Sequence, residues 1–362
     1  MPSAKFKILS AEKMGRRLSV TLFLLSLMAV LIGAFFLDLA LGSVQIPLQE
    51  VITILLGGQP EKASWTNIIL KFRLPKALTA TLAGAALGVS GLAMQTLFRN
   101  PLAGPFVLGI SSGASLGVAL VVLTASATGT PSLLKDLGVI GDLGLVLAAT
   151  LGAASVLGVV LVVSRRVQDT MTLLILGLLF GYATSAIVSI LLHFSQVESL
   201  QNYLSWTFGS FGGVTWRQML ILAPVVLIGL VAALVLSKPL NALLLGESYA
   251  RSLGLSVQQA RFWIITSASL LAGAITAFCG PIAFLGVAVP HLCRSLFNTS
   301  DHRVLVPGVT IMGAILALVA DLVAQLPGSQ IVLPLNAVTA LIGTPVVTWV
   351  ILRRNSRTSF PK

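Results

Sequence analysis

Charged side chains are scarce in this sequence. Only 9% of the 362 residues are Asp, Glu, Lys or Arg, and 56% are apolar, whereas a soluble globular protein carries about 25% charged residues. A water-facing surface of this size cannot be built from so few charges. The composition excludes an ordinary cytosolic enzyme, a disordered protein and a nucleic-acid-binding protein, and it places the chain in a membrane.

The common motifs of nucleotide and metal chemistry are also missing. The sequence has no G-x-x-x-x-G-K-[ST] loop to hold phosphates and no H-E-x-x-H pair to hold zinc. Its two cysteines, Cys279 and Cys293, lie in apolar surroundings without metal-ligand spacing, so we expect ordinary core residues and no metal or cofactor bound by this chain. Among eleven carboxylates, only Asp38 and Asp321 fall within or at the ends of apolar runs. Because a proton or sodium relay needs a row of buried acids, energy for transport has to come from elsewhere.

Long apolar runs dominate what is present. Residues 18–37 are 20 uncharged residues in a row, which is enough to cross ~30 Å of hydrocarbon and too long for the apolar part of a signal peptide. Charges and Pro/Gly breaks divide the rest of the chain. We predict an all-α fold of ten transmembrane helices at residues 18–37, 77–98, 106–124, 143–164, 171–192, 218–237, two within 262–293, 304–320 and 335–352.

The basic residues predict the orientation of these spans. Cytoplasmic loops of membrane proteins carry an excess of Lys and Arg. With both termini inside, 17 of the 23 basic residues are cytoplasmic and 6 are outside. We therefore expect a cytoplasmic tail at residues 1–17, a membrane domain at 18–352 and a second cytoplasmic tail at 353–362, so the net charge of +12 reflects topology rather than a nucleic-acid partner.

Two loops are longer than a connection requires. The outer segment 42–76 contains an apolar-periodic stretch at 44–56, which predicts a short helix on the membrane surface. The cytoplasmic segment 238–261 predicts a short amphipathic helix that includes Tyr249 and Leu253 and ends at Gly254. We favour a docking element for a cytoplasmic partner over a plain interfacial helix.

Small residues are arranged in two ways. Glycines at four-residue spacing, such as Gly84/Gly88, are typical of close helix packing. The stretch 100–113 is different, because Asn100, Pro101 and Pro105 leave backbone groups without helical partners at a membrane boundary. Such backbone is tolerated only inside protein or beside a water-filled cavity, so this stretch predicts a pathway-lining or gating segment.

An intramembrane serine protease is the enzyme alternative. Gly88-Val89-Ser90-Gly91 matches the G-x-S-G pattern around such a nucleophile, and His193 and His291 are candidate bases. Neither histidine is placed beside Ser90 by the predicted spans, so this reading is the weaker one.

Several segments taken together resemble one protein family. They are RLPKALTATLAGAALGVSGLAMQTLFRNPLAGPFVLGISSGAS (73–115), SWTFGSFGGVTW (205–216), LGESYARSLGL (245–255), GPIAFLGVAVPHLCRSLFNTSDHRVLVPG (280–308) and LPLNAVTALIGTPVV (333–347). In this order they resemble the FecCD-type permease subunits of bacterial ABC importers for iron siderophores, haem and vitamin B12. The resemblance implies ten helices in the inner membrane, a homodimer in membrane lipid, two cytoplasmic ABC ATPase subunits that bind the ATP, and an extracytoplasmic substrate-binding protein.

The resemblance also suggests roles for individual residues. It assigns ATPase docking to Glu247, Ala250, Arg251 and Gly254, and contact with the binding protein to Arg73 and Lys76, for which interfacial anchoring is an equal alternative. It suggests that the translocation path or gate includes Gln95, Asn100, Pro101, Gly109, Ser111, Ser112, Gly113, Gly177 and Gly181.

Three positions depart from the vitamin B12 members of the family. This chain has Gln325 where they carry Arg, and Val332 and Asn336 where their closing pattern has Glu and Gly. We therefore expect a transport subunit, not an enzyme, that carries a metal chelate. A ferric siderophore or haem is slightly preferred, and a corrinoid is the alternative.

Overall fold

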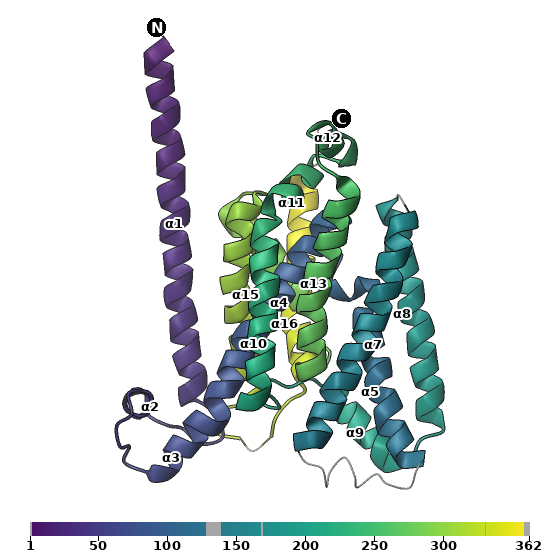
Figure 1. The fold of residues 1–362 in the computed structure, drawn as a ribbon. Helices are drawn as coiled ribbons and strands as arrows, with labels where there is room; N and C mark the ends of the chain where they lie inside the picture. Colours follow the sequence, from purple (N-terminus) through teal and green to yellow (C-terminus); the bar gives the residue numbers. More distant parts are fainter. Residues whose placement is uncertain (1, 128–138, 168, 330, 358–362) are drawn as a thin grey trace.

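The fold is built from helices. The computed structural model describes residues 2–127, 139–167, 169–329 and 331–357, and every regular element in these ranges is a helix (Figure 1). Ten of the helices run along the bundle: α1 (Pro2–Ala40), α4 (Leu74–Leu97), α5 (Ile110–Ala127), α7 (Val139–Arg166), α8 (Thr170–His193), α10 (Trp216–Val235), α13 (Val257–Cys279), α14 (Leu285–Phe297), α15 (His302–Gln325) and α16 (Leu335–Arg357). Short elements lie at the ends of the bundle: α2 (Leu48–Leu55), α3 (Ala63–Asn67), a π-helix (Ile68–Arg73), a 3₁₀-helix (Pro105–Leu108), α9 (Val197–Thr207), α11 (Ser237–Leu244) and α12 (Glu247–Ser252).

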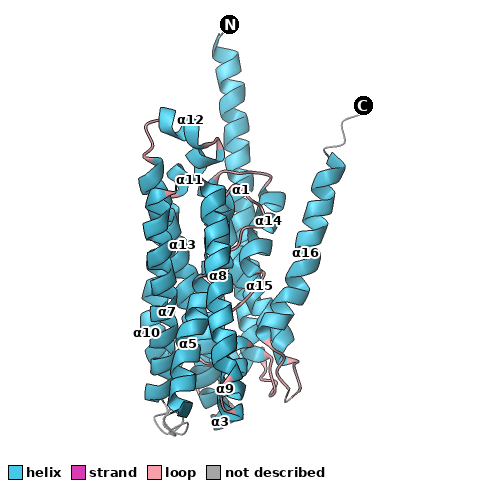
Figure 2. Ribbon diagram, turned by 90° about the vertical axis from the view of Figure 1, so that its right-hand side faces the viewer, coloured by secondary structure: helices cyan, strands magenta, loops and turns pink. Residues whose placement is uncertain are grey.

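The ten long helices coincide with the ten predicted spans. In the described residues, seven are long and apolar enough to cross a membrane, and three shorter apolar helices fall at 110–122, 285–297 and 335–349. The predicted break of 262–293 into a long and a short helix is confirmed by α13 and α14. Because the number of spans is even, the start of α1 and the last turns of α16 lie at the same end as α11 and α12 (Figure 2). We name this end the α12 end; α2, α3 and α9 lie at the opposite end.

Helix α4 is the centre of the bundle. Its span is 83% buried, against 11% for α1, and it packs against α10, α13, α14 and α15. Close approach explains the glycines: a Cβ on Gly84 would lie 2.0 Å from the carbonyl oxygen of Gly313 in α15, and a Cβ on Gly91 1.7 Å from that of Gly286 in α14. A second packed group consists of α5, α7 and α8, which lie together on one side of Figure 1 and pack against α13.

Several predicted boundaries are wrong by a turn or more. Helix α1 extends back to Pro2, through the predicted tail. The span predicted at 77–98 begins at Ala63, because α3 and the π-helix run continuously into α4, and Trp65 and Ile69 are buried there. Helix α5 begins at Ile110, since Gly109 takes a left-handed conformation after the 3₁₀-helix. Residues 238–261, for which one short helix is predicted, fold as two helices, α11 and α12. Lys135, counted in the charge balance, and residues 358–362 of the predicted C-terminal tail lie outside the described residues.

Candidate functional site

The docking loop, residues 238–261, has a defined local structure at the α12 end. Helix α12 ends in a Schellman motif, in which Leu255 N–H donates to Ala250 O (3.1 Å) and Gly254 N–H to Arg251 O (2.9 Å). Gly254 has φ +83°, and nothing lies within 4 Å of the position that its Cβ would take. Glycine is therefore required for the backbone conformation and not for space, as the sequence predicts for a cap.

An ion pair fixes α12 to the bundle. Arg261 in α13 is 3% exposed; its guanidinium donates to Glu247 Oε1 (2.8 Å) and to the carbonyl of Val167, between α7 and α8 (2.9 Å). Glu247 therefore has a structural partner inside this chain. Ala250 is on the buried side of α12. Arg251 is 60% exposed, and its guanidinium is 3.7 Å from Glu247 Oε2, farther than that of Arg261. Of the four predicted docking residues, Arg251 and Gly254 are the ones presented outward.

Apolar side chains complete the exposed face of the docking loop. Leu245, Tyr249 and Leu253 are 63%, 53% and 61% exposed. They surround α12, which projects from the end of the bundle (Figure 1). An apolar ridge beside a basic residue is typical of a protein contact.

Residues 98–109, which we name the re-entrant segment, lead from α4 back into the bundle. Asn100 Oδ1 accepts from Leu102 N–H (2.9 Å), and the carbonyl of Pro101 accepts from His291 Nε2 (2.8 Å). A carbonyl only accepts, so Nε2 of His291 carries the proton. Gln95, in the last turn of α4 before the segment, bridges Arg294 and the carbonyl of Val287 in α14. The bonds to Leu102 N–H and to the Pro101 carbonyl satisfy backbone groups that lie outside the helices.

The far end of this segment meets α8. A Cβ on Gly109 (φ +75°) would lie 3.2 Å from the Gly177 carbonyl and from the Gly181 nitrogen. Gly177 is seven residues into α8, about 10 Å along its axis, so α5 starts well inside the bundle. Ser111 and Ser112 follow, half-buried, and Gly113 packs against Gly152 of α7. The structure thus brings the predicted path residues into one continuous region. Their role in translocation stays a prediction.

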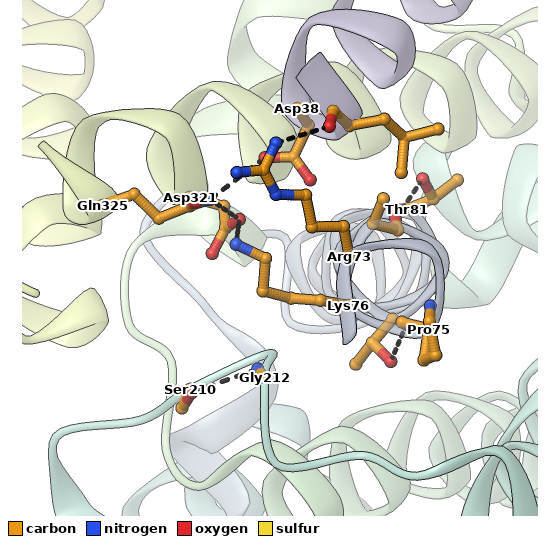
Figure 3. A network of polar contacts seen from close by, with 12 residues as sticks. Asp38, Arg73, Pro75, Lys76, Thr81, Ser210, Gly212, Asp321 and Gln325 are labelled. Carbon is orange, nitrogen blue, oxygen red and sulfur yellow. Dashed lines mark hydrogen bonds and ion pairs between the residues drawn. The ribbon is translucent and has the colours of Figure 1, made fainter. Parts of the chain in front are cut away.

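Arg73 and Lys76 lie near the opposite end in what we name the outer polar cluster: Asp38, Arg73, Lys76, Asp321 and Gln325 (Figure 3). Arg73 is 6% exposed, and its guanidinium donates to the carbonyls of Leu39 (2.8 Å), Ala40 (3.0 Å) and Val44. Lys76 Nζ is 2.8 Å from Asp321 Oδ2. Both cations are therefore engaged inside the chain, which favours anchoring over the predicted contact with a binding protein. That contact stays a prediction and would require the cluster to open.

Gln325 is the member that sequence reasoning missed. Its amide nitrogen donates to Asp321 Oδ2 (2.6 Å) and to Asp38 Oδ1 (3.3 Å), so it links α15 to α1. In the sequence, Gln325 stands out only because it replaces a positive charge. The positions of Asp38 and Asp321 at the ends of spans could have indicated a polar cluster, because ionisable groups in a membrane pair with one another.

Ser90 does not have the surroundings of a nucleophile. Its hydroxyl is fully buried and donates to the carbonyl of Ala268 in α13 (2.7 Å). His291 donates to the Pro101 carbonyl instead, and His193 is at the last residue of α8. The serine is a helix-to-helix link, so the protease alternative is wrong. In the ranges that the structure describes, no three His, Cys, Asp or Glu side chains are grouped to hold a metal ion; the absence of a cofactor stays a prediction.

A bundle of ten apolar helices with a projecting docking loop and an irregular segment at its centre is the architecture of a membrane permease. Comparisons with known proteins agree. The sequence model of the FecCD transport family matches residues 30–353. The chain is 38% identical over 288 residues to the vitamin B12 import system permease protein BtuC of Salmonella paratyphi A, covering 79% of this chain and 83% of that protein. It is 36% identical over 334 residues to the same permease of Shigella boydii serotype 18, covering 91% and 95%.

A solved structure is also similar. An inward-facing metal-chelate type ABC transporter superposes with a TM-score of 0.79 at 28% identity, covering 91% of this chain and 99% of that chain. The chain belongs to the FecCD transport family. It is a multi-pass inner-membrane permease of the ABC-importer type and not itself an enzyme.

Proposed function

We propose that this chain, as a homodimer, is the translocation subunit of an importer that carries a metal chelate inward across the membrane. Two cytoplasmic ABC ATPases bind the docking loops and hydrolyse ATP, and an extracytoplasmic binding protein delivers the chelate. The observation that carries the proposal is the exposed ridge of α12, fixed to the bundle by the Glu247–Arg261 ion pair. A short helix held rigidly at the end of a bundle is suited to convert movement of a bound partner into movement of the helices.

The chain's own composition supports an external energy source. It has no phosphate-binding loop, and its membrane acids are engaged: Asp321 with Lys76, and both Asp38 and Asp321 with Gln325. Asp321 is held by an ion pair and Asp38 by a hydrogen bond from Gln325, and two such acids do not form the row of buried acids that an ion relay needs.

The second copy is proposed to cover α8. Along this helix Ile175, Leu179, Tyr182 and Ile190 are exposed by 53%, 56%, 72% and 60%. The same helix packs against Gly109 through Gly177 and Gly181, so a path between two copies would run beside the re-entrant segment. The test is disulfide cross-linking of a Tyr182→Cys variant in membranes. Failure to cross-link at positions along this face would oppose the arrangement.

The substrate is a metal chelate, with a corrinoid as the first candidate. Two relatives at 36–38% identity are vitamin B12 import permeases, and the similar solved structure is of a metal-chelate type transporter. This reverses the slight sequence-based preference for a ferric siderophore or haem. The test is uptake of radiolabelled cyanocobalamin, ferrichrome and haemin into cells with and without the gene; loss of cyanocobalamin uptake alone selects the corrinoid.

ATPase docking is tested at two outward positions. We expect Gly254→Val, which forces a β-branched residue to φ +83°, and Arg251→Glu, which reverses an exposed charge, to lower substrate-stimulated ATP hydrolysis by about tenfold in proteoliposomes that contain the ATPase. Gly254→Asn is the matched control, because Asn adopts the left-handed conformation at low cost. Hydrolysis unchanged in both variants would refute docking at α12. Recovery of the chain from its host membrane without an ABC ATPase would oppose the importer itself.

A further inference from the structure

Three polar side chains, the half-buried Asn241 and the buried His302 and Thr96, connect the docking loop to the end of α4. Asn241 is in α11, His302 is the first residue of α15, and Thr96 is in the last turn of α4. His302 Nδ1 is 2.7 Å from Asn241 Oδ1, and His302 Nε2 is 2.8 Å from Thr96 Oγ1. His302 has no exposed surface, and Thr96 is 1% exposed.

The direction of each bond follows from the donor and acceptor inventory. Asn241 Nδ2 donates to Asp301 Oδ1 (2.6 Å), which turns Oδ1 of the amide toward His302. That oxygen accepts from the backbone N–H of His302 (2.9 Å) and from Nδ1. Because an amide oxygen is only an acceptor, Nδ1 carries a proton. In a neutral imidazole Nε2 is then an acceptor. The single hydroxyl proton of Thr96 lies within reach of both His302 Nε2 (2.8 Å) and the Leu92 carbonyl (2.9 Å), so the two acceptors share one donor.

The chain of bonds ends where the re-entrant segment begins. Thr96 O accepts from Arg99 N–H (3.2 Å), and Arg99 has φ +48°. Gly246, between α11 and α12, faces the same place, since a Cβ on it would be 3.9 Å from Arg99 Nη1. The docking loop therefore meets the last turn of α4 through His302 and lies near Arg99 of the re-entrant segment.

We propose that Asn241, His302 and Thr96 are positioning residues that transmit displacement of the docking loop to the re-entrant segment. This inference rests on the proposed function, in which movement of the docking loop has to reach the re-entrant segment. Helix α11 lies across the ends of α4 and α15, and α12 follows it after two residues. His302 and Thr96 are buried, so separating them leaves His302 Nε2 without a partner away from water, which disfavours breaking this contact. Movement of α11 therefore moves Thr96 with it.

The first test uses the purified chain alone, by amide hydrogen exchange in detergent. Asn241→Leu removes the first bond, and the side chain of Asn241 bonds Asp301 and His302 rather than residues 98–104. We expect this variant and Thr96→Val each to raise exchange at the amides of Asn100 and Ala103 about tenfold. Thr79→Val is the matched control: Thr79 is equally buried in α4 and bonds its own helix in the same way, but it is remote from His302. Unchanged exchange in Asn241→Leu would overturn the proposal.

The second test measures coupling with the ATPase present. We expect Thr96→Val to lower substrate transported per ATP hydrolysed by about tenfold, a typical coupling magnitude, and Thr96→Ser to restore it, because the hydroxyl returns. The double variant Asn241→Leu/Thr96→Val should be no worse than the single ones, since both interrupt one connection. Additive losses, or a Thr96→Val ratio equal to that of Thr79→Val, would refute transmission. Failure of the wild-type chain to transport would refute the proposed function, while the exchange result would still decide the connection.

Discussion

Single residues in the outer polar cluster hold three helices together. Two acids, Asp38 and Asp321, face two cations, Arg73 and Lys76, so the cluster is formally neutral. Burial removes water from each charge, and the cost is offset only while partners remain in place. Arg73 also satisfies three carbonyls where α1 ends, so the cluster caps one helix while it joins it to two others.

Loss of one partner in this cluster should therefore be expensive. We predict that Asp321→Asn lowers the free energy of unfolding by about 3–5 kcal/mol, because the Lys76 ammonium stays buried without a carboxylate. The measurement is chemical unfolding in detergent micelles. Lys76→Met/Asp321→Leu should recover much of the loss, since apolar replacement of both partners is often neutral. Glu61→Gln, at an exposed loop position, is the control. An Asp321→Asn variant as stable as this control would contradict the assigned role.

Pairs of helices are set by contacts between backbones. Helices α4 and α15 meet at Gly84 and Gly313, and α4 and α14 at Gly91 and Gly286. Between membrane helices there is little hydrophobic driving force, so dispersion contacts at such close distances contribute much of the association. The four-residue glycine spacing that includes Gly84 predicts close packing there, and the structure confirms it and identifies α15 as the partner helix.

This packing gives a matched pair of substitutions. We predict that Gly84→Ala destabilises the protein by about 1–3 kcal/mol, because the added methyl group would lie 2.0 Å from the Gly313 carbonyl. Gly33→Ala in α1, where no atom lies within 4 Å, should be neutral or stabilising by up to about 1 kcal/mol, since Ala is the better helix former. Unfolding curves of both variants decide the point; equal shifts would exclude close packing as the reason for Gly84.

The start of α8 depends on a charged cap. Asp169 accepts from the hydroxyl (2.7 Å) and the backbone N–H (2.8 Å) of Thr172, and these bonds hold the pKa of its carboxyl below the usual value. A lowered pKa in the folded state means that the stabilisation is present above the unfolded value of 3.8 and is lost as pH falls through the folded value.

A pH series should show this dependence. We expect wild type to exceed Asp169→Ala in stability at pH 7, and the difference to shrink as the pH falls below about 4. Thermal unfolding in detergent from pH 7 to pH 3 measures it. Asp169→Asn is the reference, because Asn caps a helix without titrating. If the stability difference between wild type and Asp169→Ala does not change over this range, the ionised carboxylate is not the cause of the stabilisation.

Orientation in the membrane belongs to the whole molecule. The ends of the bundle are distinguished by the docking loop at one end and by α2, α3 and α9 at the other. Basic residues predict that the α12 end is cytoplasmic. Cys279 and Cys293 are buried, at 4% and 0% exposure, so the native protein has little background reactivity toward a thiol reagent.

Introduced cysteines test this orientation. Lys62 and Lys238 are exposed at opposite ends of the bundle. We expect a membrane-impermeant maleimide to label Lys62→Cys in intact spheroplasts and Lys238→Cys only after permeabilisation. The unsubstituted chain is the control. The reverse pattern would invert the assignment of both termini and remove the docking loop from the side where ATP is available.

The sequence by itself determined the number of helices, their membrane location and the class of protein. Long uncharged runs can satisfy their backbone in hydrocarbon only as helices, so hydrophobicity alone specifies the spans. Motifs in several loops specified the family, and Gly254 was predicted as a cap because a local backbone conformation depends on local residues. The helix boundaries did not follow from hydrophobicity. Burial of Trp65 in α3 and of Ile69 in the π-helix extends the helical path ahead of α4, beyond the apolar run in the sequence.

Only the tertiary structure decided which polar groups meet. Gln325 and Asp38 are 287 positions apart, and Thr96 and His302 are 206 apart, so no local pattern connects them. For Arg73 and Lys76 the sequence leaves docking and interfacial anchoring as equal alternatives, and only the packing of α1, α4 and α15 places carboxylates and carbonyls around them. The partners of a polar group in a membrane protein depend on where helices cross, and crossing positions follow from the shapes of the helix surfaces rather than from their hydrophobicity.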